Sequence, residues 1–377
     1  MIPFRRPACG CALPPVPLRA PVPEPQPGDE HGWRLGDPIT YENLTVFPVL
    51  ASQTANTSGF ATLDEALASG DAIVTEQGSY MRRTRDGVDE PVYSGAQVNQ
   101  LVLINRGKRP LLLLAGEVVS GGKQDRIVGK DRIVPVGAPP LALDVFCVEH
   151  GRWTGGSDKF TAANTMVHPS VREKAAVEQD QGKVWAAVRS GTTTTNTRAS
   201  TGSAGNARAD AAAPMVSSEA LSTVMAESAP TESYRKIYQS RAVGTSVEAF
   251  AAEMERRFKR ATQNRKDEHV VGVVVAYGDE VAWSDIFVSS ELFRVYWPKL
   301  LRSYVVEAVT RPRLRETASL ADARDFLRPA DGHVREESDP GVYIWRERTD
   351  GRRAEIELEA LDPKPLTLHW MKVLRAS

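Results

Sequence analysis

The sequence predicts an α+β protein, with an antiparallel, β-rich, sandwich-like N-terminal part and an α+β C-terminal part that can share one core. In the first third, short β-rich runs are separated by turn signals every 8–12 residues or so, which is typical of antiparallel sandwiches and barrels. In the last third, strand patterns alternate with helical periodicity. The chain has 377 residues, 41% of them hydrophobic, so it is large enough to bury a core without disulfides or structural metals.

Composition excludes several classes of protein. Lys and Arg number 47 against 48 Asp and Glu, a net charge of −1, so we expect no nucleic-acid partner that depends on bulk positive charge. The apolar runs are shorter than the roughly 18 residues of a membrane span, and we expect no membrane partner. Three cysteines exclude a disulfide framework. Arg5-Arg6 is not followed by the apolar region of an export signal, so we expect a cytoplasmic protein.

Residues 1–32 form a Pro-rich segment, which we interpret as a disordered tail. Cys9 and Cys11 lie in it; a metal clip or a lipid anchor would explain them, but no matching Cys/His pair is nearby, and we expect two exposed thiols.

A β-rich domain is expected over 33–155. Thr62–Glu65 is a capping box that opens a short helix, which Gly70 closes. Val98–Asn105 and Leu111–Ala115 flank a turn-type sequence and predict a hairpin. Further strands are expected at Leu44–Leu50, Val118–Val119, Asp131–Val136 and Leu141–His150.

A helical segment is expected over 156–262, where Ser170–Glu173 and Thr245–Glu248 resemble capping boxes. It is interrupted at 191–230 by a Thr-, Ala- and Ser-rich insertion, which predicts a flexible loop that could be deleted without loss of the fold.

An α+β segment is expected over 263–377. A hairpin is predicted at Gly278-Asp279. An apolar helix follows Ser290, and Pro298 within it predicts either a kink or two abutting helices. Three closing strands complete the chain.

The segment Gly116–Arg126 carries the first candidate site. It resembles a phosphate-binding loop but has the wrong spacing, has Gln124 in place of Ser or Thr, and precedes a strand instead of a helix. A weaker version remains, in which Gly121 and Gly122 present backbone N–H groups to an anion beside Gln124, while Lys123 and Arg126 supply exposed charge. Glu117 is the acid/base candidate. The alternative is a glycine bulge between strands.

The segment Asp144–Trp153 carries the second. Strand alternation places Cys147 and His150 on opposite faces, so we interpret Cys147 as a buried packing thiol and not as a nucleophile. His150 is a proton-transfer or orienting candidate, Arg152 an anion contact and Trp153 a stacking surface. The alternative for His150 is a structural role.

Four motifs, Gly116–Arg126, Phe146–Trp153, His168–Arg172 and Trp297–Tyr304, resemble the ADP-ribosylglycohydrolase-and-rhodanese-phosphatase-associated protein domain family. The resemblance extends from about Leu35 to Leu374. It implies an association with ADP-ribose or phosphate chemistry, but it brings no catalytic residues with it. The Pro-rich tail and the 191–230 insertion depart from the family.

The sequence therefore predicts recognition, with turnover as an option, of a small anionic ligand of the nucleotide or ADP-ribose class. The alternative is a non-catalytic domain that binds a protein partner. No metal site is expected, and the residues indicate no particular cofactor; a cupin-type metal centre would need histidines and a glutamate that are missing near Asp131–Gly137. Convergence of 116–126 and 150–153 on one pocket would favour the ligand-binding hypothesis.

Overall fold

A computed structural model describes residues 32–76, 79–83, 89–93, 100–122, 124–148, 159–190, 213–217, 220, 234, 236–241, 243–263, 265, 268–314 and 316–375. The predicted tail with Cys9 and Cys11, the candidates Lys123, His150, Arg152 and Trp153, and most of the 191–230 insertion lie outside these residues.

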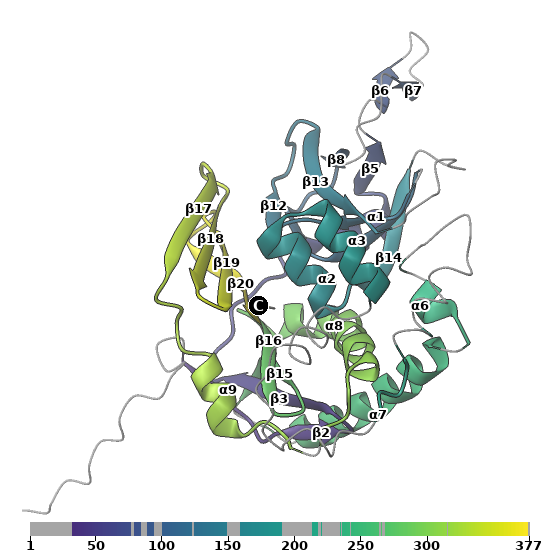
Figure 1. Ribbon diagram of the computed structural model, residues 1–377. Helices are drawn as coiled ribbons and strands as arrows, with labels where there is room; N and C mark the ends of the chain where they lie inside the picture. Colours follow the sequence, from purple (N-terminus) through teal and green to yellow (C-terminus); the bar gives the residue numbers. More distant parts are fainter. Residues whose placement is uncertain are drawn as a thin grey trace, which may run out of the picture.

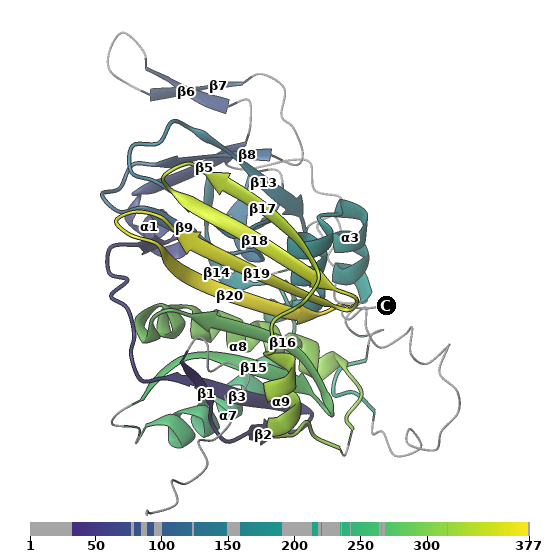
Figure 2. The same ribbon diagram turned by 90° about the vertical axis from the view of Figure 1, so that its left-hand side faces the viewer.

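The largest sheet has nine strands and draws on both ends of the chain (Figures 1 and 2). Its order is β1-β3-β15-β16-β20-β19-β18-β17, with β2 also paired to β3. All its pairings are antiparallel. The strands are β1 (Trp33–Leu35), β2 (Ile39–Tyr41), β3 (Leu44–Ala51), β15 (His269–Tyr277), β16 (Glu280–Phe287), β17 (His333–Asp339), β18 (Tyr343–Asp350), β19 (Arg353–Ala360) and β20 (Leu366–Leu374).

A six-stranded antiparallel sheet, in the order β14-β10-β11-β13-β8-β5, forms the second layer. A three-stranded sheet, β12-β9-β4, and a two-stranded ribbon of β6 and β7 accompany it. These strands are β4 (Ala61–Thr62), β5 (Ala72–Glu76), β6 (Ser79–Arg83), β7 (Asp89–Tyr93), β8 (Gln100–Asn105), β9 (Leu111–Leu113), β10 (Glu117–Gly121), β11 (Arg126–Val128), β12 (Arg132–Val134), β13 (Leu141–Cys147) and β14 (Phe160–Met166).

Helices pack on both faces of the nine-stranded sheet. The apolar side chains of α7 and α8 share a core with Val273 and Val275, and those of α9 share another with Val274 and Ala276. Successive strand residues point to opposite faces, which explains the division. The described helices are α1 (Leu63–Ser69), α2 (Pro169–Glu173), the π-helix η2 (Lys174–Glu178), α3 (Gln181–Ser190), α6 (Lys236–Gln239), α7 (Gly244–Thr262), α8 (Ser290–Thr310) and α9 (Leu320–Phe326).

The α+β, sandwich-like class predicted from the sequence is confirmed, and one core joins its two parts. Leu112 and Ile127 of the N-terminal sheets pack in the same cluster as Trp345 and Met371 of the nine-stranded sheet. In Figure 2, β17–β20 lie across the N-terminal strands. The domain division at 155 stays a prediction. The strands β1–β3, which come before it, pair into a sheet that is built mainly from residues after 263.

Several local predictions are confirmed. Thr62 and Glu65 form a reciprocal capping box, and Gly70 closes α1 in the left-handed conformation. Gly278-Asp279 connects β15 and β16 as a two-residue hairpin loop.

Other local predictions are wrong. β8 and β9 are not a hairpin: β8 pairs with β5 and β13, whereas β9 pairs with β4 and β12. The helices α2 and α7 have no side-chain cap. Of the two alternatives predicted at Pro298, two abutting helices are wrong, because α8 is one helix that contains this proline. Part of the insertion is also packed, because Val216 is 4% exposed and donates its N–H to Val309 O at 2.8 Å.

Candidate functional site

The turn after β10 lies at one end of the six-stranded sheet, beside the residues that flank segment 149–158. Gly121 is paired with Phe160 in β14, and Val148 N–H donates to Asp125 O at 3.3 Å. Lys159 forms a bridge with Thr75 at the same end. The residues on both sides of 149–158, the range that contains His150, Arg152 and Trp153, therefore contact the first candidate loop.

Packing accounts for the two glycines of this turn. Gly121 has φ +149, and a Cβ there would lie 2.5 Å from Lys159 O. Gly122 has φ +54, and its Cβ would lie 2.5 Å from the Phe160 ring and 2.6 Å from Glu76 Oε1. A larger residue at Gly121 would have to displace the backbone at the start of β14, because a Cβ does not approach other atoms this closely. A larger residue at Gly122 would have to displace the Phe160 ring and the Glu76 carboxylate.

Arg126 is buried, so the expectation that it supplies exposed charge is wrong. It is 2% exposed, as is Gln124, and it lies opposite Cys147 in the β11–β13 ladder. Burial raises the pKa of the Cys147 thiol, and the neighbouring Arg126 only partly offsets this. Cys147 is fully buried, as predicted, and its sulfur is a thiol and not part of a disulfide. Gln124 Oε1 has no hydrogen-bond partner among the described residues.

Glu117 belongs to a different environment from the turn. It stands four residues before Gly121, or about 13 Å along an extended strand. Its Oε1 accepts from Lys299 Nζ at 2.5 Å and its Oε2 from Leu114 N–H at 2.7 Å, and Lys299 also donates to Asp64 Oδ2 at 2.6 Å. Burial raises the pKa of Glu117 despite the nearby ammonium. The structure therefore does not bring the Glu117 carboxylate to the glycine turn at Gly121 and Gly122.

Sequence reasoning missed a chain of buried charges at the centre of the molecule. His369 of β20 lies between two carboxylates, with Nδ1 2.6 Å from Asp131 Oδ2 and Nε2 3.0 Å from Asp285 Oδ1. The other oxygen of Asp285 accepts from Arg172 Nη1 at 2.8 Å and from Trp283 Nε1 at 2.7 Å. His369, Asp131 and Asp285 are each at most 1% exposed.

The charges of these buried groups shift one another's pKa values. Burial would raise the pKa of Asp285, but Arg172 and His369 lower it to about 2. Burial would likewise lower the pKa of His369, but Asp131 and Asp285 outweigh it and raise that pKa. The order Asp131, His369, Asp285, Arg172 therefore alternates negative and positive charge, which stabilises each ion by its neighbours.

These groups come from three elements and one loop, and their role in the fold is to join these segments. Asp131 precedes β12, Arg172 lies in α2, and Asp285 and His369 lie in β16 and β20. Asp131 Oδ1 also accepts from Ala115 N–H, and Arg172 Nε donates to Ala115 O, both at 2.7 Å. The sequence signal that could have revealed this cluster is a polar residue within an otherwise apolar strand, such as Asp285 in β16 and His369 in β20.

A second buried cluster explains why Ser170 does not cap α2. Its hydroxyl donates to Glu307 Oε1 at 2.7 Å and its N–H to Glu307 Oε2 at 3.0 Å. Arg311 Nη2 donates to the same carboxylate at 2.8 Å. Burial would raise the pKa of Glu307, but Arg311 and the other donors lower it.

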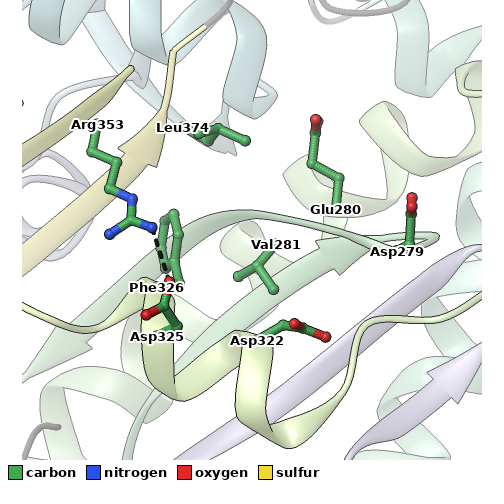
Figure 3. A pocket seen from close by; sticks show the side chains of 8 residues that line it. All are labelled: Asp279, Glu280, Val281, Asp322, Asp325, Phe326, Arg353 and Leu374. Atoms are coloured by element: carbon green, nitrogen blue, oxygen red, sulfur yellow. Dashed lines mark hydrogen bonds and ion pairs between the residues drawn. The ribbon is translucent and has the colours of Figure 1, made fainter. Parts of the chain in front are cut away.

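An open pocket of about 310 Å³ lies between α9, the β15–β16 turn and the ends of β19 and β20 (Figure 3). Its lining carries four carboxylates and one guanidinium, and that guanidinium, Arg353, is 3.0 Å from Asp325. The sign of this charge disfavours an anion. The lining residues are Asp279, Glu280, Val281, Asp322, Asp325, Phe326, Arg353 and Leu374.

Two further features of the described residues bear on the class of site. No group of three or more His, Cys, Asp or Glu side chains there is arranged to hold a metal ion. No described helix is long and apolar enough to span a membrane.

The fold and its buried charge clusters thus define an α+β protein with mainly antiparallel sheets, whose two parts are joined by buried ion pairs. The chain belongs to the family of the ARG and Rhodanese-Phosphatase-superfamily-associated Protein domain, whose model matches residues 32–371. No curated protein and no solved structure matches it.

Proposed function

We propose that this protein recognises a small anionic ligand of the nucleotide or ADP-ribose class at the end of the six-stranded sheet near Gly121 and Gly122. One observation carries the proposal: Val148 and Lys159, which flank segment 149–158, lie against the turn that follows β10. The residues on either side of His150, Arg152 and Trp153 thus lie beside the glycine turn of the first motif. The family name, which links the domain to ARG and rhodanese-phosphatase proteins, supports the same ligand class.

The described side chains of this end do not supply a net positive charge. Glu76, Asp125 and Arg126 are buried there and Lys159 is exposed, which makes two carboxylates against two cations. Further positive charge for an anion would come from Lys123 and Arg152, with His150 and Trp153 as additional contacts. All four lie outside the described residues, and their roles are predictions from the sequence.

Recognition without turnover by Glu117 is the version that the geometry favours. The Glu117 carboxylate is paired with Lys299 and lies about four strand residues from the turn. A carboxylate with both oxygens engaged in the interior is not placed to exchange a proton with a ligand at the sheet end. This observation also keeps a non-catalytic binding domain as the second candidate.

The test is calorimetric titration of ADP-ribose, AMP and ADP into wild type, Lys123→Ala, Arg152→Ala and the control Lys108→Ala. Lys108 is an exposed cation in the turn between β8 and β9. Each site variant should weaken binding by about 1.5–3 kcal/mol, as for a charged hydrogen bond, and the loss should shrink at higher salt. Lys108→Ala should bind as wild type does.

No binding to wild type would remove this ligand class in favour of the protein-interaction domain. Binding that both alanine variants retain in full would place the ligand elsewhere. Arg126→Ala is unsuitable as a probe, since removing a buried guanidinium would also change folding.

A further inference from the structure

The strand β17 forms an open edge of the nine-stranded sheet. It is the outermost strand on the left of Figure 1, and among the strands that the structure describes it pairs only with β18. Six of its seven residues are exposed, and Val334 is 51% exposed. An edge strand presents unpaired backbone N–H and C=O groups, which can accept another strand.

Contacts on one face hold β17 in place. Glu337 pairs with Lys130 at 2.5 Å, and the Lys130 ammonium lies 4.0 Å from the centre of the Trp345 ring. The Arg335 guanidinium lies 5.7 Å from the same ring. On the other face, Glu336 pairs with Arg346 at 2.9 Å. The edge is therefore an anchored strand, already in the conformation that strand addition needs.

The charges along β17 complement a second copy of the same strand. Residues directly opposite in an antiparallel pair point to the same face, so a two-fold axis normal to the sheet can pass only through a residue position. An axis through Glu336 pairs all seven residues. It places His333 opposite Asp339, Arg335 opposite Glu337 and Val334 opposite Ser338, each twice by symmetry.

Axes through the neighbouring residues give a less favourable pairing of the two strands. An axis through Arg335 sets two arginines face to face, and an axis through Glu337 leaves His333 beyond the paired strand. In the Glu336 register the only like-charged pair is Glu336 with itself, and Arg346 partly neutralises each carboxylate. Charges that would repel a foreign strand thus match when the partner is a second copy.

We propose that β17 is a self-association edge, through which two copies of this chain pair antiparallel about Glu336 and continue one sheet across both. This proposal is independent of the ligand proposed above. A single strand pair buries little area, so the dimer is a weak one that forms at high protein concentration.

The experiment is sedimentation equilibrium of the full chain up to near-millimolar concentration, with two matched pairs of variants. Glu336→Gln removes the like-charged pair and should lower the dimer Kd by a factor of roughly 1.4–5. Glu359→Gln is its control, because Glu359 also pairs with Arg346, at 2.8 Å, but lies on β19 away from the edge. It should leave the Kd unchanged.

The second pair tests register. His333→Glu sets like charges against Asp339 at two symmetric places and should raise the Kd by roughly 2- to 25-fold. Adding Asp339→Lys in the same chain should restore wild-type association. Circular dichroism checks that each variant is folded.

A wild-type chain that stays monomeric at the highest concentration would overturn the proposal. So would a dimer whose Kd ignores Glu336→Gln and His333→Glu, since that dimer would use another surface. Equal effects of Glu336→Gln and Glu359→Gln would assign the change to Arg346 and also refute it.

Discussion

Replacing His369 tests the central charge chain. His369→Gln removes the cation between Asp131 and Asp285, which both lie in the interior. In this variant Arg172 and Trp283 still donate hydrogen bonds to Asp285, but Asp131 Oδ2 loses its partner, His369 Nδ1. Breaking a buried ion pair from one side costs about 3–5 kcal/mol of unfolding free energy, because the remaining charge stays buried. We expect that loss near pH 6.

The pH dependence gives a second, independent readout. The pKa of folded His369 is raised above its ordinary value of 6.5, so the folded state holds a proton that the unfolded state releases as pH rises. The stability that this proton contributes is fully present below pH 6.5 and is lost toward the higher folded pKa. The slope is at most about 1.4 kcal/mol per pH unit. The advantage of wild type over His369→Gln should therefore shrink as pH rises.

Urea unfolding from about pH 6 to 9 measures both effects. His269→Gln is the control, because His269 lies in the same sheet but is exposed. A His369→Gln loss under about 1 kcal/mol would refute the buried ion chain. A loss that stays constant across the pH range would refute a protonated His369.

Two further predictions use the same assay. Lys299→Met leaves Glu117 buried without its cation and should cost about 3–5 kcal/mol of unfolding free energy. Lys299→Met with Glu117→Leu should recover most of that loss, because the fully buried carboxylate is then gone and the remaining partner, Asp64, is partly exposed. A double variant as unstable as the single one would contradict this reasoning. Val216→Ala should lower the free energy of unfolding by roughly 1–3 kcal/mol, because Val216 packs in the core. Met215→Ala is its control and should change that free energy little, since Met215 is exposed. Equal effects of the two variants would show that the packed part of the insertion contributes nothing to stability.

Local chemistry was readable from the sequence alone. Thr62, Glu65 and Gly70 cap a helix through contacts within a few residues, and Gly278-Asp279 closes a hairpin between adjacent strands. The burial of Cys147 followed from strand alternation. In each case the interacting groups are neighbours along the chain, so their spacing carries the information.

Long-range pairing was decided only by the tertiary structure. Ser170 has the sequence of a helix cap, but its hydroxyl bonds Glu307, which is 137 residues away. The turn between β8 and β9 looks like a hairpin, yet each strand finds partners elsewhere because burying both apolar faces outweighs local turn preference.

The candidate site shows the same division. The α+β class, the family and the two motifs that carry glycines and charges could all be predicted from the residues alone. Only the folded chain placed Glu117 with Lys299, buried Arg126, and assembled Asp131, Asp285 and His369 from three distant segments. The physical reason is that a buried charge is tolerated only beside its counter-charge, and that partner is chosen by packing in space and not by distance along the sequence.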